Sequence, residues 1–404
     1  MASRTSHPDV IVVGAGVLGS AVAYEAARRR LRTLILDQGP APASGASRWS
    51  LGGLTWLNLA DARLLPLAWE GWERYQTLAD ELGVDTGFRP ATLLALAQTR
   101  VALDRLARLV DSGRARGFQG HLVGPDGLAG LQPGLRADTL VGGAVCAQGH
   151  VDPPTLVGAL LTAAKRLGAE VVNESPVHAL TVRRGRCVGV ETPEGSVAAG
   201  SVLLTAGAWT RSLLRSVGTT LPILHTHAEV LETPPQPVTL SCIVVGGGGE
   251  RGDLERAMAS RYPASEWRDA GDHDLVPPVL EFGAAQFPDG RIQIGQVSRA
   301  VPGLRAVPRP ESEAAIRNLA RTLLPGLADL PAALRTCPVS IALDRLPVAG
   351  LVPSVEGLYV MAGLPSPLIY LPALAPRMAA LLAGETVPEL EPFNPSRFAP
   401  AAPL

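Results

Sequence analysis

The chain opens with a glycine-rich turn whose spacing suits phosphate binding. Gly14, Gly16 and Gly19 follow five residues of strand character, Asp9–Val13, and precede an alanine-rich stretch of helical character. Gly14 allows a tight turn, Gly16 lets a pyrophosphate approach the backbone, and Gly19 lets helix and strand pack closely. The free N–H groups at the start of the helix can then bind phosphate oxygens.

A second stretch of strand character, Arg32–Leu36, leads into the acidic residue Asp37. This acid stands about 20 residues after the glycines, where a carboxylate accepts hydrogen bonds from ribose hydroxyls and disfavours a 2′-phosphate. The order strand, glycine turn, helix, strand and acid therefore predicts binding of FAD or NAD rather than NADP. The alternative is a glycine turn in an ordinary parallel sheet.

Few other residues offer chemistry. The four cysteines form no CxxC pair, so zinc or iron–sulfur binding has no signature. His225 and His227 alternate on an expected strand and face one side of it, but no third ligand stands at a suitable spacing, so we predict no metal. Lys165 is the only lysine, so any mechanism that needs a lysine depends on it.

Composition limits the partners and the compartment. The chain has 404 residues, of which 47 % are hydrophobic, enough for two domains or more. A net charge of −1 gives no nucleic-acid footprint. No apolar run is long enough for a membrane span, and the N-terminus has no signal-peptide pattern. We expect a cytoplasmic protein.

Periodicity and glycine or proline breaks predict the elements that position these residues. We expect helices over 61–82, 101–117, 155–167, 311–323 and 371–383. We expect strands over 93–97, 279–286 and 291–297, and a run of strands with a β-meander over 170–205. The charged segment 246–275 is interpreted as a surface insertion, with a lid as the alternative.

The order of these pieces resembles the FAD-dependent D-amino-acid oxidase family. This family includes glycine oxidase, sarcosine oxidase, D-amino-acid dehydrogenase and the flavin subunits of hetero-oligomeric amine dehydrogenases. The matching stretches are Val10–Asp37, Ser44–Leu54, Gly149–Pro153, Val177, Leu203–Trp209, Gly290–Gly295, Asp344–Gly350 and Gly357–Gly363.

The resemblance implies an α/β fold of the glutathione-reductase-like type, in which a Rossmann-type FAD-binding domain is interleaved with an α+β substrate domain. The FAD-binding domain would comprise 1–80, 148–216 and 336–398, and the substrate domain 81–147 and 217–335. By the same resemblance, the FAD contacts would be Gly14, Gly16, Val17, Leu18, Gly19, Asp37, Gln38, Ser44, Ser47, Arg48, Gly52, Gly53, Leu54, Val177, Ala206, Gly207, Trp209, Gly363, Pro365, Ser366 and Leu368.

The chain also departs from the family pattern. The turn Gly363–Tyr370 lacks the family's histidine, and Val339 stands where an arginine would grip a substrate carboxylate. Gln293 stands where sarcosine-oxidase-like members carry a lysine that promotes reaction with oxygen. Either a substrate carboxylate needs another cation, such as Arg48, Arg299 or Arg345, or the substrate is not a simple amino acid.

Three residues are candidates for catalysis: Arg48, His225 and Tyr370. His225 would handle a proton or simply form part of a polar strand face, and Tyr370 would edge the flavin or pack in the core. Cys337 has the spacing of a flavin-linking cysteine, but a buried structural thiol is the commoner fate and is the one we expect.

The resemblance implies FAD-dependent oxidation of an amine or amino acid to the imine by hydride transfer. The missing lysine and the altered turn favour a dehydrogenase subunit that works with partner subunits or another electron acceptor. The alternatives are an oxygen-using oxidase of the glycine or sarcosine type and, in another class, a non-catalytic flavoprotein scaffold.

Overall fold

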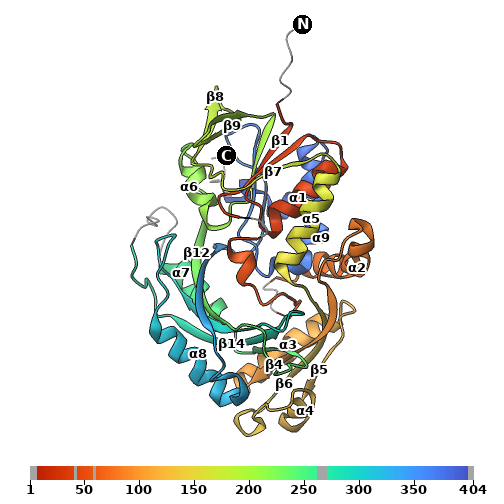
Figure 1. Cartoon of the computed structure of the whole chain (residues 1–404), viewed down its shortest axis with the longest axis vertical. Coiled ribbons are helices and arrows are strands. Elements are labelled where there is room, and N and C mark those ends of the chain that lie inside the picture. Colours follow the sequence, from red (N-terminus) through yellow and green to blue (C-terminus); the bar gives the residue numbers. More distant parts are fainter. Residues whose placement is uncertain (1–6, 41–42, 58–60, 262–270, 399–404) are drawn as a thin grey trace, which may run out of the picture.

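The computed structural model describes residues 7–40, 43–57, 61–261 and 271–398. Figure 1 shows two layered parts along the long axis, one built on a six-stranded sheet and the other on a large curved sheet. The chain passes between them several times, so each part combines segments that are far apart in sequence.

The six-stranded sheet carries the glycine turn. Its strands, from edge to edge, are β17 (Val348–Leu351), β18 (Leu358–Ala362), β11 (Ser201–Leu204), β1 (Val10–Val13), β2 (Thr33–Leu36) and β7 (Glu170–Val172). β17 runs antiparallel to β18, and the other neighbours are parallel. The carboxyl ends of β1, β2 and β11 therefore meet at one edge, where an open α/β sheet binds its ligands.

Helices cover this sheet because their small and apolar residues pack closely. α1 (Val17–Arg28) lies between α5 (Pro153–Arg166) and α9 (Pro367–Leu382), and α2 (Leu64–Leu82) packs on α9 (Figure 1). α2 ends at Gly83, whose φ of +60° suits glycine best. Beside the sheet lie α6 (Thr210–Arg215) and the meander β8 (Ala179–Arg183), β9 (Arg186–Thr192) and β10 (Gly195–Ala198).

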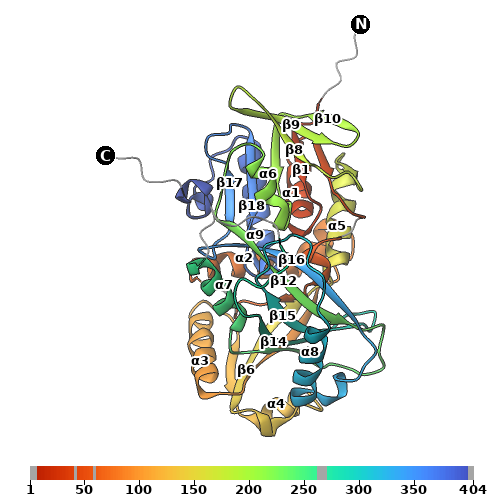
Figure 2. The same cartoon turned by 90° about the vertical axis from the view of Figure 1, so that its left-hand side faces the viewer.

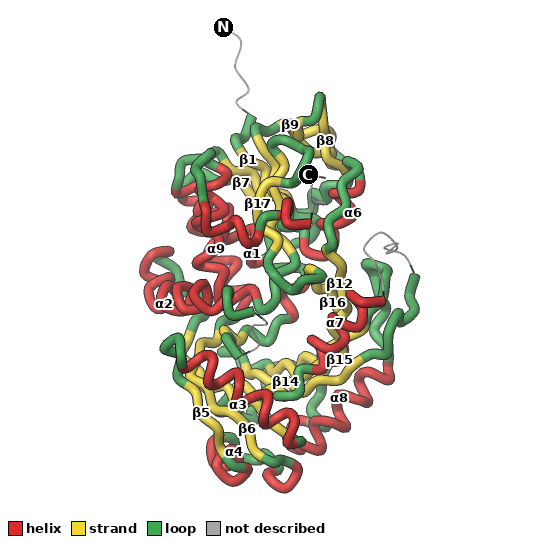
Figure 3. The backbone as a smooth tube through the Cα atoms, turned by 180° about the vertical axis from the view of Figure 1, so that it is seen from behind, coloured by secondary structure: helices red, strands yellow, loops and turns green. Residues whose placement is uncertain are grey.

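The large sheet carries the rest of the strands. Their order is β16 (Ala333–Ala342), β12 (Ile223–Glu232), β15 (Ile292–Arg299), β14 (Val279–Gln286), β13 (Ile243–Gly246), β4 (Arg89–Ala97), β6 (Gly142–His150) and β3 (Gly53–Leu54), with β5 (Gly120–Val123) paired to β6. Figure 2 shows α3 (Arg100–Arg114), α4 (Pro125–Leu131) and α8 (Pro310–Leu323) around it. Figure 3 shows α7 (Glu250–Arg261) and α8 beside β14 and β15.

Most of the expected elements are present with shifted ends. The meander within 170–205 is confirmed by β8, β9 and β10. The last helix begins at Pro367 rather than at residue 371, because proline fits the first turn of a helix. Residues 262–270 of the expected insertion lie outside the described residues.

Two of the predicted domain segments do not coincide with the sheets of the structure. Residue 336 lies inside β16, which pairs along its whole length with β12 in the large sheet. β3 belongs to the large sheet as well, although it falls within the predicted segment 1–80. The division into two domains stays a prediction. Nowhere in the described ranges does a helix combine the length and apolar character that a bilayer span requires.

Candidate functional site

A cavity of about 430 Å³ connects the two sheets. The glycine turn and the ends of β2 and β11 form one end of it, and β14, α7 and the turn after β16 form the other. The short helix Ala46–Trp49 and the start of α9 line the section between them. Segments from both sheets therefore enclose one continuous space.

Glycine is required in this turn because neighbouring backbone atoms lie too close to leave room for a side chain. Gly14 has a φ of +103°, and a Cβ there would lie 2.7 Å from the carbonyl oxygen of Thr205. A Cβ on Gly19 would overlap the carbonyl oxygen of Gly14. Gly16 faces Ser47, whose Oγ accepts a 3.1 Å hydrogen bond from the N–H of Val17. The turn before α1 thus presents backbone to the cavity at Gly14 and Gly16, with the Ser47 hydroxyl beside the first N–H of the helix.

Asp37 is fixed at the end of β2. One of its carboxylate oxygens accepts from the N–H of Ala15 at 2.6 Å, and the other accepts from the N–H of Gly39 at 2.8 Å. Ser44 donates to the second oxygen at 3.2 Å. The carboxylate still lines the cavity and retains lone pairs for further donors such as sugar hydroxyls.

Most of the predicted FAD contacts gather on this cavity. They are Gly14, Gly16, Val17, Leu18, Asp37, Gln38, Ser44, Ser47, Gly53, Val177, Ala206, Gly207, Trp209, Pro365, Ser366 and Leu368. Five others do not line it: Gly19, Arg48, Gly52, Leu54 and Gly363. The four apolar members of this second group pack beneath the lining, and Gly363, for example, lies against the backbone of Ala342.

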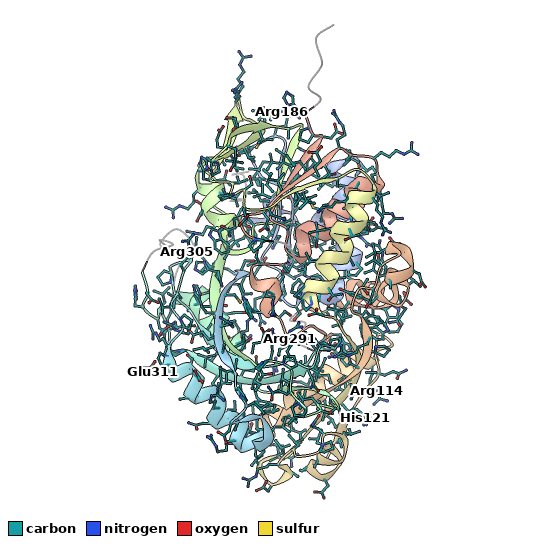
Figure 4. All side chains as sticks on the ribbon, viewed as in Figure 1. Arg114, His121, Arg186, Arg291, Arg305 and Glu311 are labelled. Carbon is teal, nitrogen blue, oxygen red and sulfur yellow. The ribbon has the colours of Figure 1, made fainter. Side chains whose placement is uncertain are left out.

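Arg48 is held away from the cavity by an ion pair. Both of its Nη atoms donate to Glu232, at 2.7 and 2.8 Å, and its guanidinium lies 4.6 Å from the ring centroid of Trp49. Arg291 adds a second cation, 3.5 Å from Glu232, and also pairs with Asp152. Figure 4 shows Arg291 near the middle of the view, and its side chain is 12 % exposed. These ion pairs therefore connect segments that are distant in sequence, and Glu232 neutralises the charge of Arg48.

His225 and Tyr370 are also outside the cavity lining. His225 is fully buried, its Nε2 lies 3.3 Å from the carbonyl oxygen of Gly303, and burial followed by the neighbouring His227 lowers its pKa to about 4. The buried Tyr370 hydroxyl donates to the carbonyl oxygen of Pro365, and burial raises its pKa. The structure places no substrate-facing atom on either residue, and their catalytic roles stay predictions.

The end of the cavity at α7 carries charged residues, of which the sequence analysis named only Arg345, as a possible cation for a substrate carboxylate. Arg105, Arg251, Glu255, Glu281 and Arg345 all line it. Burial, followed by the charge of Glu250, raises the pKa of Glu281 to about 7. The available signal was the charged spacing of segment 246–275, which we interpreted as a surface insertion. Its helix α7 instead forms part of the cavity wall.

Two further residues answer questions raised by the sequence. Arg299 is almost fully buried and pairs with Glu229 at 2.9 Å and Asp274 at 3.0 Å, so it offers no cation to a substrate. Cys337 lines the cavity, and burial raises its pKa to about 12. A thiolate, the form that bonds covalently, is therefore scarce on Cys337 at neutral pH.

A Rossmann-type glycine turn, a fixed acid after β2 and a long cavity between two sheets define a dinucleotide-binding protein of the two-part flavoprotein type. The family model for FAD dependent oxidoreductases matches residues 9–381, and the chain belongs to that family. FAD is the cofactor of this family, and the residues fit it, because the backbone of the glycine turn, the polar residues Ser47 and Asp37 and several apolar side chains line one cavity.

Named relatives support this assignment. Over 252 residues the chain is 30 % identical to glycine oxidase of Geobacillus kaustophilus, a match that covers 60 % of this chain and 66 % of that protein. The crystal structure of glycine oxidase from Geobacillus kaustophilus superposes with a TM-score of 0.80 at 25 % identity, covering 98 % of this chain and all of that one.

Longer relatives match over a similar stretch. Human sarcosine dehydrogenase is 31 % identical over 235 residues, which is 56 % of this chain and 26 % of that protein. Dimethylglycine dehydrogenase of Mus musculus is 26 % identical over 230 residues, 57 % of this chain and 26 % of that protein. The chain thus spans about a quarter of the length of these relatives.

Proposed function

We propose that this protein oxidises an amine or amino acid to the imine with FAD, as a dehydrogenase that passes electrons to an acceptor other than oxygen. The observation that carries the proposal is the single cavity that joins the glycine turn to a charged end at α7. Glycine oxidase and the sarcosine and dimethylglycine dehydrogenases among its relatives are all named for amine-containing substrates.

The chain's own residues bind, orient and shield. The N-terminus of α1 and Ser47 would hold the diphosphate, and Asp37 would hold the ribose of the adenosine half. Apolar side chains that line the cavity, among them Leu51, Leu93 and Ile243, would shield a bound ring system from water. When bound, FAD supplies the hydride acceptor. The N-terminus of α9, with Ser366 and Leu368 on the cavity, would add partial positive charge beside the ring system.

The preference for a dehydrogenase rests on the position of the only lysine, which lies away from the cavity. Lys165, the only lysine, is exposed on α5 and does not line the cavity. Gln293, where the resemblance places an oxygen-promoting lysine, is fully buried and donates to Glu232 at 3.1 Å. Among the described residues, no lysine ammonium group therefore stands beside the cavity to attract oxygen or stabilise superoxide. Partner subunits or a small acceptor would then take the electrons.

The test is anaerobic titration of the purified, flavin-containing protein with candidate amino acids and N-methylated amino acids. We expect one class to bleach the flavin absorbance, and we expect slow recovery in air but fast recovery with an artificial electron acceptor. Recovery in air as fast as with the acceptor would establish the oxidase instead. If none of these compounds bleaches the flavin, the oxidation proposal fails, and a protein that purifies without flavin supports the scaffold.

A further inference from the structure

Two arginines at the α7 end of the cavity share one carboxylate. Glu255 accepts from Nε of Arg251 at 3.0 Å through one oxygen, and its other oxygen lies 3.2 Å from Nε of Arg345. Glu255 is buried, whereas the arginine side chains are 30 % and 22 % exposed and line the cavity. The buried acid thus positions two cations side by side.

The outer ends of these guanidinium groups are available. Within the described residues, no hydrogen bond or ion pair joins the Nη atoms of Arg251 or Arg345 to a protein partner. Paired N–H groups of this kind match the two oxygens of a carboxylate. Glu255 neutralises one of the two positive charges, so the pair retains a net attraction for one anion.

The backbone around Arg345 is specialised for holding this side chain. Arg345 has a φ of +60°, a conformation that an arginine rarely adopts, and its N–H donates to the carbonyl oxygen of Ala342 at 2.9 Å. Gly252, inside α7, faces it, and a Cβ there would lie 3.0 Å from Nη1 of Arg345. The positive φ of Arg345 and a glycine at position 252 inside a helix both lower stability. Both allow the guanidinium group of Arg345 to lie where it does.

Glu281 on β14 faces the same end of the cavity. The structure shows no hydrogen bond to its carboxyl group from any described residue, and its charged neighbours are Glu250, Arg251 and Glu255 on α7 and Arg105 on α3. Burial raises its pKa to about 7, so it can take up or release a proton near neutrality.

We infer that Arg251 and Arg345 bind the carboxylate of an amino-acid substrate, and that Glu281 takes the proton from the substrate's ammonium group. The substrate class is therefore a zwitterionic amino acid. In the proton transfer an N–H bond breaks, an O–H bond forms on Glu281, and nitrogen keeps its electron pair. The product is the neutral amine that hydride transfer requires. This inference rests on the proposed function. It places the carboxylate site on α7 and the turn after β16, whereas the family resemblance places it on β16, at the position of Val339.

The first test measures binding of acetate to the flavin-containing protein by calorimetry. Arg251→Gln and Arg345→Gln should each raise the Kd for acetate at least tenfold and leave the weak binding of acetamide unchanged. Arg256→Gln is the matched control, because Arg256 stands on the same helix, is exposed, and does not line the cavity. Flavin content and Tm report whether each variant is folded.

A second variant separates binding from structure. Asn tolerates positive φ better than Arg does, so Arg345→Asn should keep or raise Tm and yet raise the Kd for acetate as Arg345→Gln does. Unchanged acetate affinity in the Arg251 and Arg345 variants would overturn the carboxylate site. A wild-type protein that does not bind acetate, or an equal loss of affinity in Arg256→Gln, would overturn it as well.

Glu281 is tested by pH. The rate of anaerobic flavin reduction should level off above a pH of about 7 in the wild-type protein, and in Glu281→Gln it should keep rising towards the pKa of the substrate amine. Coincident profiles would remove Glu281 from the reaction. If no amine bleaches the flavin but acetate binds as described, the proposed function fails and the carboxylate site stands. If an amine bleaches the flavin but the arginine variants bind acetate normally, the proposed function stands and the carboxylate site fails.

Discussion

The carboxylate of Asp37 accepts a 2.6 Å hydrogen bond from the N–H of Ala15, which ties the end of β2 to the middle of the glycine turn. Asp37, which we expect to bind the ribose of the cofactor, thus also fixes the loop that we expect to bind its phosphates. The two halves of the predicted nucleotide site are therefore coupled through one side chain.

Asp37→Ala should lower flavin occupancy strongly. The change removes the acceptor for Ala15 and Gly39, and a hydrogen bond to a charged group contributes about 1.5–3 kcal/mol, so we expect at least a tenfold loss in FAD affinity. The flavin-to-protein ratio after dialysis is the measurement. Asp138→Ala is the control, because Asp138 is exposed and pairs only with its neighbour Arg136 among the described residues. Full occupancy in Asp37→Ala would contradict the prediction.

Gly19→Ala should yield a protein that is destabilised and lacks flavin. The new methyl group would overlap the carbonyl oxygen of Gly14, which must then move and deform the turn. Gly158→Ala is the matched control. It also lies in a helix, α5, but nothing stands within 4 Å of its added Cβ, so we expect a gain of about 0.5–1 kcal/mol from helix propensity. Thermal unfolding and flavin absorbance compare the two, and a flavin-replete Gly19→Ala protein would refute the assignment.

The flavin should be released by acid. Because burial raises the pKa of Cys337 to about 12, we expect the thiol to stay protonated at neutral pH and to form no bond to the cofactor. Acid precipitation of the wild-type protein should leave all flavin colour in the supernatant, and Cys337→Ser should bind FAD normally. Colour retained in the wild-type pellet and lost in Cys337→Ser would show a covalent link instead.

Glu281→Gln should stabilise the protein at alkaline pH. The pKa of Glu281 rises in the folded state from 4.5 to about 7, so its contribution to stability is fully present below a pH of about 4.5 and is lost as pH rises through about 7. Glutamine stays neutral, so the free energy of unfolding should exceed that of the wild-type protein by about 1–3 kcal/mol above this range and differ little below it.

Denaturant titrations at several pH values measure this difference. Glu385→Gln is the control, since Glu385 is 55 % exposed and should change stability little at any pH. A difference between Glu281→Gln and the wild-type protein that does not vary with pH would show that folding does not raise the pKa of Glu281.

The nucleotide site could be predicted from the sequence because its determinants are local. Gly14, Gly16 and Gly19 act within one turn, and Asp37 follows on the next parallel strand, so spacing along the chain fixes their separation in space. The later glycine-containing segments, such as Ala206 and Gly207, were placed by a resemblance of order, and the structure brings them to the same cavity.

The candidates for catalysis could not be chosen in the same way. Arg48 has the right charge, but Glu232 is 184 residues away in sequence and takes both of its Nη atoms. Arg251 lies on α7 and Arg345 lies in the turn after β16, and only folding places both of them on Glu255.

The sequence by itself determined the dinucleotide site, since strand–turn–helix patterns and glycine spacing act over short distances, and its resemblance to a known family implied the α/β fold and FAD. Tertiary structure alone decided which charged groups face the cavity, because an arginine is available to a ligand only when its Nη atoms face the cavity and no carboxylate binds them, as Glu232 binds those of Arg48. That depends on which strands of the large sheet lie side by side.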